Sequence, residues 1–140
     1  MTADRICLDI PAAAGYLHIL SECIAEIVER EAGLPEPDQT AYSIQLAAQE
    51  ISSNIVRHAY SDSQGRIVAR IILEPSPRRL VIELRDSGDP FDPGQVPEPD
   101  LDAAQVHGYG LFLARALLDE LRYEARPGEN RWHLVKNLAE

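Results

Sequence analysis

The chain has few cysteines, and neither of them belongs to a recognisable motif. Cys7 and Cys23 are the only two among 140 residues, they lack C-x-x-C spacing, and no pair of histidines accompanies them. This pattern argues against a zinc site and against a disulfide framework. Because both cysteines stand in apolar-patterned segments, we expect buried free thiols.

Long apolar runs and a surplus of positive charge are also missing. No segment approaches the length of about 20 apolar residues that a membrane span needs, and residues 1–9 are too polar and acidic for a signal peptide. Lys and Arg number 13 against 23 Asp and Glu, for a net charge of −10. Nucleic-acid binding needs a basic face. We therefore expect a soluble, cytoplasmic protein without membrane or direct nucleic-acid contacts, whose acidic surface suits a basic partner.

The length of 140 residues and an apolar content of 45% predict one domain, residues 1–140, with a single core. Apolar spacing indicates the elements. We expect strands over residues 5–10, 67–73, 80–85, 122–125 and 132–135, and helices between Pro11 and Gly33, from a cap at Asp38 or Thr40 to about Tyr60, and over residues 108–121. Hairpins outnumber crossovers in this order, which favours an α+β two-layer sandwich: a mixed, mostly antiparallel sheet with helices on one face.

The first group of candidate functional residues lies in the second predicted helix. Glu50, Asn54 and His58 recur every four residues, so they lie along one stripe at the shoulder of the apolar face. A carboxylate one turn from an amide oxygen could hold Mg²⁺ with its waters, and the carboxylate could act as a base towards a hydroxyl. The alternative is an ordinary solvated helix shoulder.

The second group follows the strand predicted over residues 80–85. A period of two places Asp86 on the same face as the apolar residues of that strand. A carboxylate there is costly without a hydrogen-bond donor, and the amine of a purine is one suitable donor. Gly88 would let the backbone approach a flat ring. The alternative is an ordinary turn after a strand.

The third group, Gly108, Gly110 and Leu111, opens the next predicted helix after a long loop with four prolines. Glycines at a helix N-terminus expose backbone N–H groups to an anion. The chain lacks the Gly-Lys-Ser/Thr of a P-loop, and Leu113 replaces the third glycine of a dinucleotide motif. Taken alone, the two glycines fit a flexible hinge equally well.

In this order, the three groups resemble the N, G1 and G2 boxes of the GHKL ATPases. The segments E-I-S-S-N-I-V-R-H-A-Y, D-S-G-D-P-F-D and G-Y-G-L-F-L are most similar to the forms found in bacterial anti-sigma factor kinases. The resemblance covers roughly residues 45–136. It implies a Bergerat-type ATP-binding fold that uses ATP and Mg²⁺.

The resemblance also implies a role for each residue of the N and G1 boxes. Glu50 would be the general base on the serine hydroxyl of a protein substrate, and Asn54 would ligate Mg²⁺ within the cofactor site. Asp86 would accept a hydrogen bond from the adenine amine, with Gly88 beside the ring.

In the G2 box, Gly108 and Gly110 would line the phosphates and Leu111 would complete the site, with residues 93–107 as the ATP lid. The chain departs from the family pattern at His107, where many relatives have a further glycine. It departs again at Asn130, which stands near the place of the threonine that often precedes the last strand.

The function implied is a protein-serine/threonine kinase that acts as an anti-sigma factor. Such a protein sequesters a sigma factor, phosphorylates an anti-anti-sigma factor on serine, and dimerises through its N-terminal part. The alternative is a nucleotide-dependent protein-binding module without kinase activity, against which Glu50 argues because an adaptor needs no base. A histidine kinase would need a phospho-accepting helical hairpin and a gyrase-like ATPase a transducer domain, and we expect neither in 140 residues.

Overall fold

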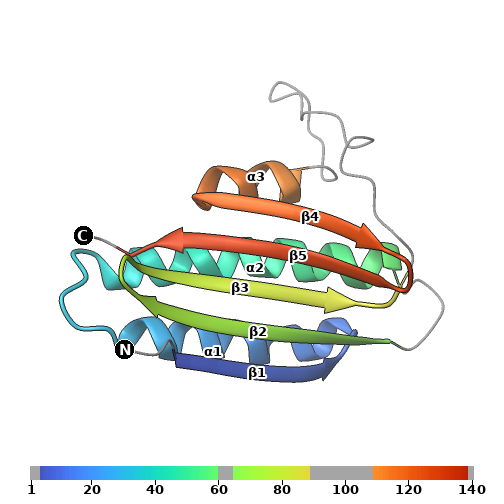
Figure 1. Ribbon diagram of the computed structural model, residues 1–140, viewed down its shortest axis with the longest axis horizontal. Helices are drawn as coiled ribbons and strands as arrows, with labels where there is room; N and C mark the ends of the chain where they lie inside the picture. The colour runs from blue at the N-terminus through green and yellow to red at the C-terminus, as the bar shows by residue number, and fades with distance from the viewer. Residues whose placement is uncertain (1–3, 60–64, 89–108, 139–140) are drawn as a thin grey trace.

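The computed structural model describes residues 4–59, 65–88 and 109–138, in which a curved sheet lies over two long helices (Figure 1). The elements follow in the order β1 (Asp4–Pro11), η1 (Ala14–Tyr16), α1 (Leu17–Glu29), α2 (Pro37–Ala59), β2 (Arg66–Pro75), β3 (Arg78–Asp86), α3 (Tyr109–Leu117), β4 (Glu120–Arg126) and β5 (Glu129–Asn137). The helices α1 and α2 cover one face of the sheet, and α3 packs against α2. This arrangement confirms the predicted α+β two-layer architecture.

The sheet has five strands in the order β1-β2-β3-β5-β4. Every strand pair among the described residues is antiparallel, so the expectation of a mixed sheet is wrong. The reason lies in the connections: α1 and α2 form a helical hairpin that returns the chain to the end where β1 finished. β3 and β4 run in the same direction, but β5 lies between them and is antiparallel to both (Figure 1).

Two predicted helix starts are wrong, each because of a proline. Pro11 ends β1, opposite Arg66, and the first α-helix begins only at Leu17. A proline is tolerated at the end of an edge strand because it has no ladder hydrogen bond to lose there. Pro37 is the first residue of α2, where its missing N–H is harmless. Asp38 therefore lies in the first turn of α2 and does not cap it.

The last predicted helix is shorter than its apolar spacing suggests. The helix α3 ends at Leu117, and Glu120 already belongs to β4. Leu118 and Leu121 continue the hydrophobic pattern, but they contribute to the core from the connection and from the strand. A periodic apolar pattern alone does not distinguish a longer helix from a shorter helix that is followed by a strand.

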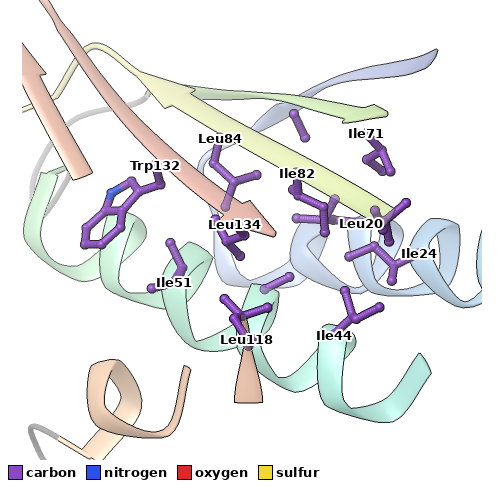
Figure 2. Packing of buried hydrophobic residues seen from close by; sticks show 14 of the residues in the cluster. Leu20, Ile24, Ile44, Ile51, Ile71, Ile82, Leu84, Leu118, Trp132 and Leu134 are labelled. Carbon is purple, nitrogen blue, oxygen red and sulfur yellow. The ribbon is translucent and has the colours of Figure 1, made fainter. Parts of the chain in front are cut away.

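One hydrophobic core fills the space between the sheet and the helices α1 and α2 (Figure 2). Its largest members come from both layers: Leu20 and Ile24 of α1, Ile44 and Ile51 of α2, and Ile71, Ile82, Leu84, Trp132 and Leu134 of the sheet. Full burial of one such side chain stabilises the fold by about 1.5–3 kcal/mol. The core therefore fixes the phase of β3 and β5, which determines the direction of the polar residues at their ends.

Both cysteines are free thiols, as predicted, but the expectation that they are buried is wrong for Cys7. It lies exposed on the edge strand β1, opposite Arg70 on the outer face of the sheet. Cys23 on α1 is partly buried, and this burial, with a smaller contribution from the Glu26 carboxylate, raises the pKa of its thiol. In the described parts of the chain, none of the helices is long and apolar enough to cross a bilayer.

Candidate functional site

The three groups singled out in the sequence gather at one end of the molecule. Figure 1 shows the C-terminal end of α2, the end of β3, the start of β5 and the start of α3 at this end. The helix α2 contacts both α3 and β5. Segments up to 79 positions apart in the chain, from Glu50 on α2 to Glu129 at the start of β5, are thus assembled by the fold itself.

Asp86 is buried at the end of β3, on the inner face of the sheet. Its exposed fraction is 6%, and it follows Leu80, Ile82 and Leu84 on that face, which confirms the strand phase predicted from the sequence. The Oδ1 atom accepts a hydrogen bond from the Gly88 backbone N–H at 2.9 Å and another from Asn130 Nδ2 at 3.0 Å. The carboxylate therefore ends a core strand with two neutral donors, and no cation of the described residues lies beside it.

Asn130 completes this arrangement from the neighbouring strand. It lies directly opposite Asp86 in the β3–β5 register and is only 3% exposed. Its Nδ2 also donates to the Gly88 carbonyl at 3.0 Å, and its Oδ1 accepts from the Tyr123 hydroxyl at 2.9 Å. We call Asp86, Asn130 and Tyr123 the inner polar cluster.

The Oδ2 atom of Asp86 is the free acceptor of the inner polar cluster. No donor among the described residues bonds to it, whereas Oδ1 takes both of the carboxylate's hydrogen bonds. Burial raises the pKa of the Asp86 carboxyl, and the hydrogen bonds from Asn130 and Gly88 offset part of that rise. A buried carboxylate with an open oxygen suits a ligand that brings an N–H donor.

Glu50 lies against the first turn of α3. A Cβ added at Gly110 would collide with the Oε2 atom of Glu50 and would lie 3.4 Å from its Cδ. A larger residue at position 110 would therefore force the end of the Glu50 side chain to move. The carboxylate lies at a helix N-terminus, where backbone N–H groups lack intrahelical partners and the helix dipole favours negative charge.

Asn54 lies one turn after Glu50 on α2 and is 8% exposed. Its Oδ1 accepts a hydrogen bond from Arg57 Nη2 at 2.6 Å. The predicted metal ligand therefore already contacts a cationic group. No cluster of three or more His, Cys, Asp or Glu able to hold a metal occurs within residues 4–59, 65–88 and 109–138. Mg²⁺ commonly binds through one or two protein ligands together with substrate phosphates, so Asn54 fits it only with a bound nucleotide.

Other predicted site residues are placed only in part. Leu111 is 4% exposed and packs in the hydrophobic core, so its side chain does not face the site. Gly108 and the proposed lid, residues 93–107, lie outside the described residues, and so does the side chain of His58. The backbone bends at Gly88, just after β3, and two hydrogen bonds, to Asp86 and from Asn130, hold it beside Asp86.

Sequence reasoning missed Tyr123 and the contact between Arg57 and Asn54. Tyr123 faces inward from β4, and its ring centroid lies 4.5 Å from that of Trp132. The signal for Tyr123 was the register of the β4–β5 hairpin, which pairs it with Trp132 and places it diagonally from Asn130. The signal for Arg57 was its spacing of three from Asn54, since residues three apart on a helix are neighbours.

A family profile and two curated relatives match nearly the whole chain. The profile of the histidine kinase-like ATPase domain matches residues 10–136. Serine-protein kinase RsbW of Staphylococcus aureus is 26% identical over 133 residues, which cover 89% of this chain and 82% of the relative. Serine-protein kinase RsbW of Bacillus velezensis is 28% identical over 137 residues, which cover 91% and 82% of the two chains.

Solved structures with the same fold include the RsbU and RsbW domains of a protein from Mycobacterium tuberculosis, with a TM-score of 0.70 and 20% identity. That match covers 98% of this chain but 33% of the solved chain, so this chain spans about a third of the solved chain's length. The histidine kinase domain of a blue-light activated kinase from Erythrobacter litoralis matches with a TM-score of 0.58 and 24% identity, covering 92% and 62% of the two chains. At these identities the likeness shows the fold alone.

Proposed function

The chain belongs to the histidine kinase-like ATPase domain family, and on this premise we propose that it is an ATP-dependent protein-serine/threonine kinase that acts as an anti-sigma factor. Membership of the family supports ATP binding. The observation that carries the proposal is the buried Asp86 carboxylate, whose Oδ2 is left open while Oδ1 is occupied. An open acceptor of this kind selects an N–H donor such as the amine of adenine.

The proposal gives each residue of the site a distinct task. Asp86 accepts the adenine amine, Gly88 lies beside the ring, and Gly108 and Gly110 line the phosphates with Leu111 behind them in the core. Asn54 contributes the amide oxygen for Mg²⁺, and Arg57 Nη2, which now donates to that oxygen, would have to leave or share it. The metal would neutralise phosphate charge, which is the main requirement of phosphoryl transfer.

Glu50 is the proposed general base. It lies one turn before Asn54 on the same stripe of α2, so it is close to the metal ligand without being needed as one. Its carboxylate faces the N-terminal turn of α3, next to Gly110. From there it would take the proton from the serine hydroxyl of a protein substrate, a step typically worth about 10²–10⁴ in rate.

The proposed partners are an anti-anti-sigma factor, which is the phosphorylation substrate, and a sigma factor, both met in the cytoplasm. The names of the two curated relatives, serine-protein kinases at 26% and 28% identity, support the kinase part. We also propose a homodimer formed through the N-terminal part. The outer edge of β1 pairs with no strand among the described residues, and Ile6 on it is 40% exposed.

One observation favours a second candidate, a nucleotide-dependent protein-binding module without kinase activity. Glu50 belongs to α2, but its carboxylate lies beside the N-terminal turn of α3. A carboxylate at a helix N-terminus stabilises the helix whether or not it acts as a base. An acidic residue at this position is therefore not by itself evidence of catalysis. The two candidates differ in phosphate transfer and agree in nucleotide binding.

The test is a pull-down from native cells with the tagged chain, in Mg-ATP and in Mg-ADP, followed by a search for phosphoserine on small co-purifying proteins. The kinase proposal predicts a phosphoserine that appears with ATP and wild-type protein but not with Glu50→Gln. Retention of a partner that depends on the nucleotide, without phosphoserine in any sample, would favour the binding module. The Glu83→Gln variant, on the outer face of β3, serves as the matched control.

A further inference from the structure

Asn130 is the most deeply buried residue of the inner polar cluster, although none of the tasks assigned above belongs to it. It is 3% exposed, against 6% for Asp86. A buried amide costs free energy unless its donors and acceptor are used. Three hydrogen bonds of its amide group lead to the nucleotide site: to Asp86, to the Gly88 carbonyl and from Tyr123.

The neighbours of Asn130 determine which way its amide group points. Two oxygens, Asp86 Oδ1 and the Gly88 carbonyl, lie 3.0 Å from one end of the amide. A carboxylate and a carbonyl only accept, so the atom between them must be the NH₂ group. The other end is then Oδ1, and the Tyr123 hydroxyl, 2.9 Å away, donates to it.

Tyr123 is itself held by the core. Its ring packs on that of Trp132, with centroids 4.5 Å apart and planes tilted by 46°, and Trp132 is 2% exposed. A series of contacts therefore runs from the buried indole through the Tyr123 hydroxyl and the Asn130 amide to one oxygen of Asp86. Each contact restricts the rotamer of the next side chain.

We propose that Asn130, anchored by Tyr123, is a positioning residue that keeps Asp86 Oδ1 occupied and Asp86 Oδ2 open, so that the site selects purine nucleotides bearing a 6-amino donor. The inference rests on the proposed function, because it takes the inner polar cluster to be the site of the base. Without Asn130, the carboxylate is free to rotate or to turn towards Gly88. Selection of the amine is then lost, while contacts to ribose and phosphates remain.

The ionisation of Asp86 offers a second readout of the same role. Burial raises the pKa of its carboxyl, and the hydrogen bond from Asn130 is the larger of the two effects that lower it. The described residues include no charged side chain that perturbs this pKa. Removing Asn130 should raise the pKa further, and the protonated oxygen would present a donor to the donor amine. The acid limb of ATP binding, which is the loss of ATP affinity as the pH falls, should therefore move to higher pH.

The experiment measures equilibrium binding of Mg-ATP and of the triphosphate of purine riboside, which lacks the 6-amino group, across pH 4.5–8. The variants are Asn130→Ala, Asn130→Thr, which restores one donor, and Tyr123→Phe, which keeps the ring. Controls are Asn137→Ala, exposed at the far end of β5, and Tyr42→Phe, whose side chain is exposed on α2. We expect Asn130→Ala to weaken ATP binding about tenfold and Tyr123→Phe about two- to threefold.

Purine riboside triphosphate should bind equally to the wild type and to both variants, and Asn130→Thr should recover part of the preference for ATP. Equal losses for both nucleotides, with an unmoved acid limb, would show a merely structural role and overturn the inference. If Asn130→Ala does not fold, Tyr123→Phe decides the question: an unchanged ATP preference refutes the inference. If the wild type binds ATP and every variant keeps the preference for ATP, only the inference is contradicted. If the wild type binds neither nucleotide, the proposed function is contradicted as well.

Discussion

Two polar clusters lie on opposite faces of the sheet around β3 and β5, with Tyr123 of β4 completing the inner one. The charged side chains of the two clusters have different kinds of partner. The inner polar cluster faces the helices at the end of the sheet. The cluster on the outer face contains two residues of each sign, Glu83, Arg85, Glu129 and Arg131. Because strand residues alternate between faces, Asp86 and Arg85 are neighbours in sequence but belong to different clusters.

In the outer cluster, every charge has an opposite charge close by. Arg85 lies 3.6 Å from Glu83 and 3.7 Å from Glu129, and Arg131 lies 2.8 Å from Glu129. The inner polar cluster has one carboxylate, two neutral side chains and an acceptor without a donor. The outer cluster thus balances its charges internally, although Glu83 Oε1, Arg85 Nε and Arg131 Nε lack a hydrogen-bond partner among the described residues. The inner polar cluster instead leaves one oxygen of an unpaired carboxylate open to a ligand.

The largest effect should come from the same change of charge applied on the two faces. Glu50→Gln removes the proposed base, so phosphate transfer to the partner's serine should fall by about 10²–10⁴ while ATP affinity barely changes. Glu83→Gln should leave transfer at the wild-type rate. Single-turnover transfer beside equilibrium ATP binding measures both. Transfer by Glu50→Gln at the wild-type rate would remove Glu50 from the chemistry.

Asp86→Asn should have the next largest effect, and this effect is on affinity. The amide retains the size of the side chain but offers a donor where the nucleotide amine needs an acceptor. Loss of a hydrogen bond to a charged group costs roughly 1.5–3 kcal/mol, or about 10- to 100-fold in affinity. Titration of a fluorescent ATP analogue measures the loss, with Glu83→Gln as the control. Unchanged affinity in folded Asp86→Asn would exclude Asp86 from the site.

Gly110→Ala tests the contact between α2 and α3 from the backbone side. The new Cβ would collide with the end of the Glu50 side chain, so the carboxylate must move while the fold persists. We expect transfer to fall about tenfold, since small misplacements of catalytic groups cost up to about 10² in rate. Gly15→Ala, with nothing within 4 Å of its added Cβ, is the matched control. Equal activity of the two variants would mean that Glu50 does not act from this position.

The smallest effect concerns stability without nucleotide. Burial raises the pKa of Asp86 above its unfolded value, so its contribution to stability is present below the unfolded pKa of about 3.9 and is lost as pH rises through the folded pKa. At pH 7 the wild type therefore carries a buried carboxylate that Asp86→Asn lacks. We expect Asp86→Asn to have the higher Tm at pH 7, and the difference to shrink towards pH 4. A lower Tm for Asp86→Asn at pH 7 would contradict this.

Local periodicity was enough to predict the inward direction of Asp86 and the stripe containing Glu50 and Asn54, because both follow from neighbours in the chain. The partnership of Asp86 and Asn130 was out of reach, since the two residues are 44 positions apart and meet only through the β3–β5 register. Cys7 is a different case. Its segment is apolar, but the period of two that puts Leu8 and Ile10 on the inner face puts Cys7 on the outer face, where it is exposed.

The most direct test of the nucleotide site is a crystal structure of the chain with Mg²⁺ and a non-hydrolysable ATP analogue. We expect the adenine amine within hydrogen-bond distance of Asp86 Oδ2, with Asn130 Nδ2 still on Oδ1 and the phosphates at the start of α3. A nucleotide bound elsewhere, or one whose amine is held by other groups while Asp86 Oδ2 faces water, would contradict it.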